Sequence, residues 1–278
     1  MLKPNVIPCK DAGEVFEAIE RFQIPPYGWI FRGQREAHWT LQPWLERRVT
    51  VSEIGDAELR MTSEFRSKAH LYTDVLPRWD DIVSWLAAMQ HHGIPTRLLD
   101  WTYSPHVALF FALSLEERDP AQKGDSAVWA VNFLELDRTA RAVSHELFEF
   151  PREVRFEDSH RFRSMAFASD PDTGRWNTTF IDHRDRGLVV PLLPEFQSLR
   201  LSSQQGLFLL NCNFQITFEN SLSAMLDESG QQIQKITFPC ALHPQLLRRL
   251  MQINIHPVSM FPDIGGLASF IALKLRLF

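Results

Sequence analysis

Residues 90–112 read QHHGIPTRLLDWTYSPHVALFFA, and this stretch decides the fold prediction because it holds the end of one helix, a strand and the start of another helix. Gly93-Ile94-Pro95 stops the helix that comes before it. Residues 96–101 have an extended pattern, and Ser104-Pro105 is typical of an N-cap followed by proline at the first helical position. The apolar run 107–113 then predicts a buried helix.

Outward from this stretch, the apolar periodicity predicts helices first and then mostly strands. On the N-terminal side we expect a strand at 29–33 and helices at 6–22, 53–71 and 80–92. On the C-terminal side we expect strands at 127–133, 188–192, 206–218 (as one or two strands) and 235–238, and helices at 244–251 and 265–275. This order favours an α+β fold with a mixed or antiparallel sheet flanked by helices.

The chain of 278 residues contains no clear linker, so we expect a single domain over residues 1–278 with its core at about 28–266. The segment at about 148–186 is polar and rich in arginine, which predicts a long surface excursion.

The composition describes a globular protein: 45% of the residues are hydrophobic, 23% are charged, and the net charge is -5. An acidic balance argues against a general nucleic-acid coat, although a local basic groove stays possible and nucleic acid is not otherwise indicated. Three scattered cysteines without a C-x-x-C pair argue against a cysteine-rich zinc site and favour the reducing cytoplasm. Since no run approaches ~20 apolar residues, we expect no membrane span.

Phe31-Arg32-Gly33-Gln34 is the first segment suited to chemistry, because it puts a guanidinium at the end of a predicted strand. A guanidinium fork fits a phosphate or a carboxylate, and glycine lets another group approach the backbone closely. The alternative is an arginine paired with a core carboxylate such as Asp100.

The second segment runs from residue 90 to residue 105. The adjacent histidines 91 and 92 lie on different faces of a helix, so they make a poor metal-chelating pair. A helix beginning at Ser104-Pro105 offers free N–H groups to an anion, and Asp100 or Thr102 suits ribose hydroxyls. In the alternative interpretation Arg97 pairs with Asp100 to tie the loop down, and Ser104 is only a cap.

The third segment, residues 200–208, leads polar side chains through a glycine into a strand. These side chains are in a position to meet Arg32 across a cleft. The alternative is an ordinary polar turn.

Taken together, these segments resemble the FRG domain, a family named for its phenylalanine-arginine-glycine triplet. The resemblance rests on residues 31–34, 90–105 and 108–112, and on the later motifs at 204–208 and 260–266, so it spans about 28–266. Members occur in bacterial and phage proteins, some of which are thought to act in defence or as toxins. The resemblance therefore implies a toxin or phage-defence effector.

The order of the motifs is also similar to the Arg-Ser-Glu pattern of ADP-ribosyltransferases, which implies a related fold and NAD as substrate. In that pattern the strand arginine grips the NAD phosphates, a hydroxyl-bearing strand shapes the nicotinamide pocket, and a late glutamate stabilises the oxocarbenium-like transition state. The candidate NAD-binding residues are therefore Arg32, Gly33, Thr96, Arg97, Thr102 and Ser104. The candidate catalytic residues are His91, Asp100 and Gln204.

The chain departs from that pattern at Gln204, which occupies the late acidic position and cannot ionise. Either Asp100 or Glu195 supplies the charge, or the reaction is slow, or the site only binds a nucleotide. His91 suits the base that activates an acceptor, because an unperturbed histidine has a pKa of about 6.5.

Three functions stay open at this point: an ADP-ribosyltransferase or NAD glycohydrolase, a non-catalytic module that senses a nucleotide or a phage protein, and a nuclease that uses residues 152–163. The sequence leaves the acceptor, the oligomeric state and the trigger open. The first two predict that Arg32, His91, Asp100, Thr102 and Gln204 share one pocket of ~300–1,000 Å³.

Overall fold

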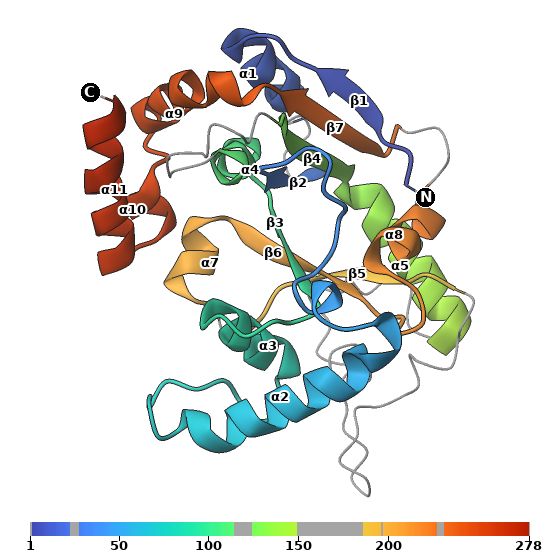
Figure 1. Cartoon of the computed structure of the whole chain (residues 1–278). Coiled ribbons are helices and arrows are strands. Elements are labelled where there is room, and N and C mark those ends of the chain that lie inside the picture. The colour runs from blue at the N-terminus through green and yellow to red at the C-terminus, as the bar shows by residue number, and fades with distance from the viewer. Residues whose placement is uncertain are drawn as a thin grey trace, which may run out of the picture.

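The computed structural model describes residues 2–22, 28–113, 124–148, 186–195, 197–226 and 231–277 of the chain, and its fold is α+β as predicted (Figure 1). The strands are β1 Asn5–Pro8, β2 Trp29–Gln34, β3 Leu98–Thr102, β4 Ser126–Asn132, β5 Val189–Leu192, β6 Gly206–Asn211 and β7 Ile233–Phe238. The helices are α1 Ala12–Glu20, α2 Ile54–Ala69, α3 Ile82–His91, α4 Pro105–Ala112, α5 Phe133–Phe148, α7 Leu199–Ser203, α8 Phe218–Met225, α9 His243–Gln252, α10 Pro257–Met260 and α11 Ile264–Leu277. Short 3₁₀ turns are η1 Leu45–Arg47, η2 Val51–Glu53 and η4 Cys240–Leu242.

The seven strands form one mixed sheet in the order β1-β7-β4-β2-β3-β6-β5. β1 pairs with β7 in parallel, and the other neighbours are antiparallel. The register between β2 and β3 consists of a single pair, Phe31 with Thr102, which we call the β2–β3 junction. The sheet therefore has two parts, β1-β7-β4-β2 and β3-β6-β5, which meet at this junction and separate beside it (Figure 1).

Two hydrophobic cores lie on opposite faces of the sheet, and β4 contributes to both. Trp129 and Val131 belong to the core formed with α3, α5 and α8, whereas Val128 and Ala130 belong to the core formed with α1, α4 and α9. Successive side chains of a strand point to opposite faces, so a strand covered on both faces is apolar throughout. The run Ala127–Val131 therefore carries no polar side chain.

Gly33 brings β2 and α4 into direct backbone contact. A Cβ at this position would lie 2.0 Å from the carbonyl oxygen of Ala108 and 2.5 Å from the amide nitrogen of Ala112. The close approach that the sequence predicted at Gly33 is therefore made by helix α4. Phe31, which precedes it on the same face of the strand, is 1% exposed and packs in the core beside α4.

The structure corrects two predicted elements. The helix expected at 6–22 is shorter, because residues 5–8 form β1 and the helix begins at Ala12, where the Asp11 carboxylate caps it. The strand region expected at 206–218 ends at Asn211, and Thr217 caps helix α8 instead. The apolar alternation at 214–218 therefore did not indicate a strand.

Helices α5, α7, α8 and α10 were not predicted, and α5 follows β4 directly. The predicted polar excursion at 148–186 lies almost entirely outside the described residues, as does the arginine-rich stretch on which the nuclease hypothesis rested. Among the described helices, none combines the length and the apolar character that crossing a membrane requires.

Candidate functional site

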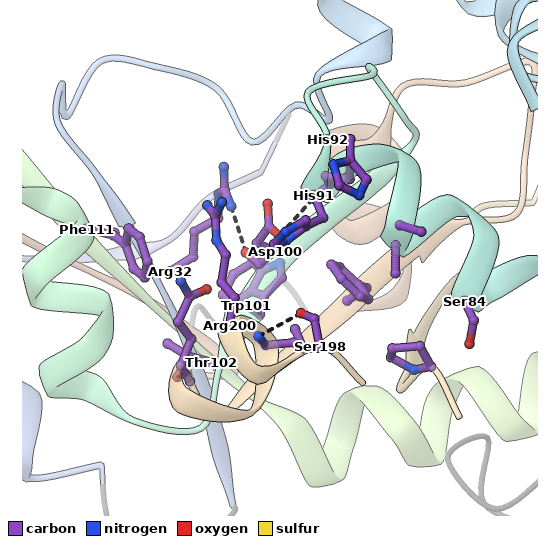
Figure 2. A pocket seen from close by; sticks show the side chains of 18 of the residues that line it. Arg32, Ser84, His91, His92, Asp100, Trp101, Thr102, Phe111, Ser198 and Arg200 are labelled. Atoms are coloured by element: carbon purple, nitrogen blue, oxygen red, sulfur yellow. Dashed lines mark hydrogen bonds between the residues drawn. The ribbon is translucent and has the colours of Figure 1, made fainter. Parts of the chain in front are cut away.

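A cavity of about 890 Å³ opens where β2 and β3 separate beside the β2–β3 junction. Its volume lies in the range of about 300–1,000 Å³ that is typical of small-molecule sites. The five residues expected to share a pocket all line it: Arg32, His91, Asp100, Thr102 and Gln204. Figure 2 shows Arg32 and Thr102 on one side of this space, with Asp100 between them and His91.

Arg32 reaches from β2 across to β3. Its Nη1 donates a hydrogen bond of 2.7 Å to the main-chain oxygen of Asp100, so it holds a carbonyl group and not the carboxylate (Figure 2). Its Nε is shielded from water and has no hydrogen-bond partner among the described residues. Burial lowers the pKa of this guanidinium, the Asp100 charge opposes that effect, and the positive charge of Arg47 adds to it. Arg32 therefore stays a cation with donor capacity left at the cavity wall.

The Asp100 carboxylate is oriented by Gln90 of α3 and by Thr96 of the turn that follows α3. Thr96 donates its hydroxyl hydrogen to Gln90 Oε1, which fixes the direction of the Gln90 amide. Gln90 Nε2 then donates to Asp100 Oδ1 at 2.7 Å. A carboxylate that receives such a bond is held in one orientation, and Asp100 remains exposed toward the cavity.

Thr102 and Gln204 connect β3 to the turn before β6. The Thr102 hydroxyl donates to the Gln204 carbonyl oxygen at 2.7 Å and accepts from the Ser104 amide at 3.0 Å. The Gln204 side chain donates from Nε2 to the carbonyl oxygen of Met260 at 3.0 Å. Both side chains therefore hold the wall of the cavity together while they line it.

His91 is the last residue of α3 and is exposed at the cavity. Partial burial lowers the pKa of His91 from 6.5, and the positive charges of His92 and Arg200 add to this effect. The imidazole is therefore mostly neutral at pH 7 and able to accept a proton. No group of three or more metal-binding side chains exists among the described residues, so the structure offers no metal centre in that part of the chain.

Three predicted NAD-binding residues lie outside the cavity wall. Thr96 is buried below Gln90. Arg97 is 5% exposed and its Nε contacts the buried Glu58 carboxylate at 2.8 Å. Ser104 caps α4 by accepting from the Val107 amide.

These positions decide between the alternatives for residues 96–104. The hypothesis that Arg97 pairs with Asp100 is wrong, because its carboxylate partner is Glu58. The serine cap and the proline at the first helical position are confirmed. The wall contains Ala108 and Phe111 of α4 but neither Ser104 nor Pro105, so the α4 N-terminus does not face the cavity.

Basic side chains dominate the charge of the cavity wall. Four arginines, Arg32, Arg35, Arg47 and Arg200, line it against one carboxylate, Asp100. Aromatic rings cover much of the remaining surface, among them Trp39, Trp85, Trp101 and Phe111. A basic and aromatic cavity in a chain whose net charge is -5 is suited to an anionic ligand with flat rings.

Residues 27–121 match the FRG domain. The resemblance to the FRG domain that the sequence motifs indicated is therefore confirmed over this segment. No curated protein and no solved structure gave a match, so the likeness to ADP-ribosyltransferases stays a prediction.

The FRG triplet now has a physical explanation, one residue at a time. Its phenylalanine fills the core beside α4, its arginine reaches the cavity, and its glycine makes room for α4. Gln34, the next residue, accepts from Trp129 Nε1 at 2.7 Å and donates to the Thr40 carbonyl at 3.0 Å. The triplet therefore places one charged group at the cavity and fixes the backbone on both sides of it.

The second half of the chain completes the cavity that residues 27–121 begin. Arg200 and Gln204 lie beyond the matched segment but line the same space, as the polar segment at 200–208 suggested. The Arg200 guanidinium lies over the ring of Phe261 at 4.7 Å. The closing motif at 260–266 thus supports the cavity through Gln204 and Arg200.

Sequence reasoning missed three residues of the site or its support. Gln90 was quoted within a motif without a role, and its polar side chain one turn before Gly93 was the available signal. Trp101 was assigned only to a strand. Arg47 lies in the short 3₁₀ turn η1 between β2 and α2, where no periodic pattern indicated the direction of its side chain.

Proposed function

We propose that the cavity binds NAD or a closely related dinucleotide and that the protein cleaves its bond to nicotinamide, as an ADP-ribosyltransferase or an NAD glycohydrolase does. The observation that carries the proposal is the convergence of four arginines and one oriented carboxylate on a cavity of about 890 Å³. The arginines suit the phosphates of the ligand, and the aromatic rings suit its bases.

Asp100 is the residue that meets the developing charge. In this reaction the bond between the ribose C1′ and the nicotinamide nitrogen breaks, and its electron pair leaves with neutral nicotinamide. The ribose becomes cationic in the transition state, and a carboxylate about 4 Å away stabilises it by about 4 kcal/mol at an effective dielectric constant of about 20. A water or acceptor oxygen then bonds to C1′, and His91 accepts its proton.

Gln204 takes a different role from the late glutamate of the related pattern. Its amide donates to the Met260 carbonyl, and it carries no charge. Glu195, the other alternative, is exposed and does not belong to the cavity wall. Among the described residues of the wall, Asp100 is therefore the one group that can supply a negative charge.

Nicotinamide release tests the proposal. The purified chain is incubated with NAD, and free nicotinamide is measured by mass spectrometry. We expect release by the wild type, a loss of about 10²–10³-fold in Asp100→Asn, and loss of release in Arg32→Ala. Arg138→Ala is the control, because Arg138 is an exposed arginine of α5 outside the cavity wall. Release that is equal in all four proteins would refute the enzymatic function.

A second candidate function is a sensor that binds the same dinucleotide without reaction. The observation that favours it is the amide at position 204, where the Arg-Ser-Glu pattern of ADP-ribosyltransferases has a glutamate. Calorimetry with NAD, followed by recovery of the ligand, separates the two. Binding with intact NAD supports the sensor, recovery of nicotinamide supports the enzyme, and absence of binding refutes both.

A further inference from the structure

A second guanidinium, that of Arg47, lines the cavity together with Arg32. Arg47 ends the short turn η1, is exposed, and lines the same cavity as Arg32. The two charges are close enough that Arg47 contributes to lowering the pKa of Arg32. No carboxylate among the described residues pairs with Arg47. Asp100 is the one carboxylate of the described wall near them, so the two guanidinium charges leave an excess of positive charge that favours an anion between them.

Two unpaired hydrogen-bond donors lie at the same place. Trp101 is 2% exposed, lines the cavity, and its Nε1 has no hydrogen-bond partner among the described residues. Arg32 Nε is unpaired in the same way. Trp101 and Arg32 are the neighbours of Thr102 and Phe31, so both donors lie on the same side of the β2–β3 junction (Figure 2).

A buried hydrogen-bond donor without an acceptor destabilises the fold. Two such donors at one place therefore indicate that an acceptor binds there. Tryptophan has one polar atom, and when it is buried that atom usually finds an acceptor. Both nitrogens are shielded from water in this structure. They can therefore bond to an oxyanion only after the side chains turn toward the cavity. The hydrogen bonds regained in this movement favour the bound state.

We propose that Arg32, Arg47 and Trp101 form a clamp for the diphosphate group of the ligand. Each guanidinium offers a fork to one phosphate, and the indole N–H donates to an oxygen beside Arg32. The negative charge of a diphosphate also removes the repulsion between the two arginines. The inference rests on the proposed ligand class, a dinucleotide, but does not require that the protein is catalytic.

Calorimetry with inorganic pyrophosphate and with inorganic phosphate tests the clamp. We expect the wild type to bind pyrophosphate at least tenfold more tightly than phosphate, because two forks are engaged instead of one. Arg47→Ala should weaken pyrophosphate binding by about 10- to 100-fold. Arg48→Ala is a matched control, since Arg48 is the next residue, exposed, and outside the cavity wall. Equal affinity of the two variants, or equal affinity of the wild type for both anions, would overturn the clamp.

The indole donor has its own readout in the nitrogen–proton spectrum of the wild type. The chain has eight tryptophans, and the indole signal that is missing from Trp101→Phe identifies Trp101. We expect this signal to move downfield when pyrophosphate is added, and the signal that is assigned by Trp29→Phe to stay in place, because Trp29 is outside the wall. If Trp101→Phe does not fold, assignment from backbone experiments on the wild type replaces it. An unmoved Trp101 signal at saturating pyrophosphate contradicts the role of the indole.

The outcomes also separate the clamp from the proposed function. If the protein binds pyrophosphate tightly but does not cleave NAD, the clamp is supported and the enzymatic function is refuted. If Arg47→Ala releases nicotinamide as fast as the wild type, the clamp is refuted and the enzymatic function is supported.

Discussion

Replacing Gly33 with alanine should displace helix α4 from the sheet. The added Cβ would lie 2.0 Å from the Ala108 carbonyl oxygen, 2.5 Å from the Ala112 nitrogen and 2.9 Å from the Phe111 carbonyl carbon. All three are backbone atoms, which cannot turn aside as a side chain does. For the first distance to reach the 3.4 Å of ordinary contact, α4 must recede by roughly 1.4 Å.

The cost follows from the same contacts. Overpacking in a well-packed core costs about 1–3 kcal/mol, and a clash with helix backbone belongs at the upper end of that range. For a chain of this size, about 3 kcal/mol lowers the midpoint of thermal unfolding by roughly 6–12 °C. Since Ala108 and Phe111 line the cavity, ligand affinity should fall together with stability.

Thermal and urea unfolding of Gly33→Ala and Gly55→Ala provide the assay. Gly55 lies inside α2, and its added Cβ would meet only Phe214 side-chain atoms, at 3.9 Å and beyond. This control should be more stable than the wild type by about 0.5–1 kcal/mol, because alanine favours a helix over glycine. If Gly33→Ala unfolds at the same temperature as the wild type, the explanation of the glycine in the FRG triplet is wrong.

Three further predictions concern charged groups. Glu58→Gln should destabilise the fold by about 3–5 kcal/mol in urea unfolding, because it leaves the buried Arg97 without its carboxylate, and an unchanged midpoint would contradict that pairing. Burial raises the pKa of Glu46 above its usual 4.5. Protonated Glu46 therefore adds stability to the fold that is fully present below about pH 4.5 and is lost as the pH rises through the raised pKa. The unfolding midpoint of Glu46→Gln should therefore fall less than that of the wild type as the pH rises above 4.5. If the midpoints of the two proteins change with pH in parallel, this explanation is wrong. Because the pKa of His91 is lowered from 6.5, the acid limb of nicotinamide release should lie below pH 6.5, and His91→Ala should slow release by about 10²-fold or more and abolish that limb.

Local sequence patterns predicted most of the elements near the cavity. Ser104-Pro105 marked the start of α4 because a serine cap and a proline act within one turn. The glycine and proline after α3 likewise marked the turn that carries Thr96. The prediction failed where the interaction joins residues far apart in the sequence. Arg97 pairs with Glu58, which lies 39 residues earlier on α2, and no local pattern shows such a partner.

The candidate site shows the same limit. The arginine of β2 and the residues at 90–105 were found because their motifs are contiguous. Arg47 escaped because its place depends on the path of residues 35–47 over the cavity, which follows from packing and not from periodicity. Gln204 was found by its motif, yet its partner, the Met260 carbonyl, became evident only when the chain was folded.

The β2–β3 junction makes the cavity a mechanical element as well as a binding site. One residue pair, and the bond from Arg32 to the Asp100 carbonyl, join the two parts of the sheet at this point. A ligand that contacts both β2 and β3 would link the two parts of the sheet and restrict their relative motion. Amide hydrogen exchange at Phe31 and Thr102 therefore registers occupancy even where no chemistry follows.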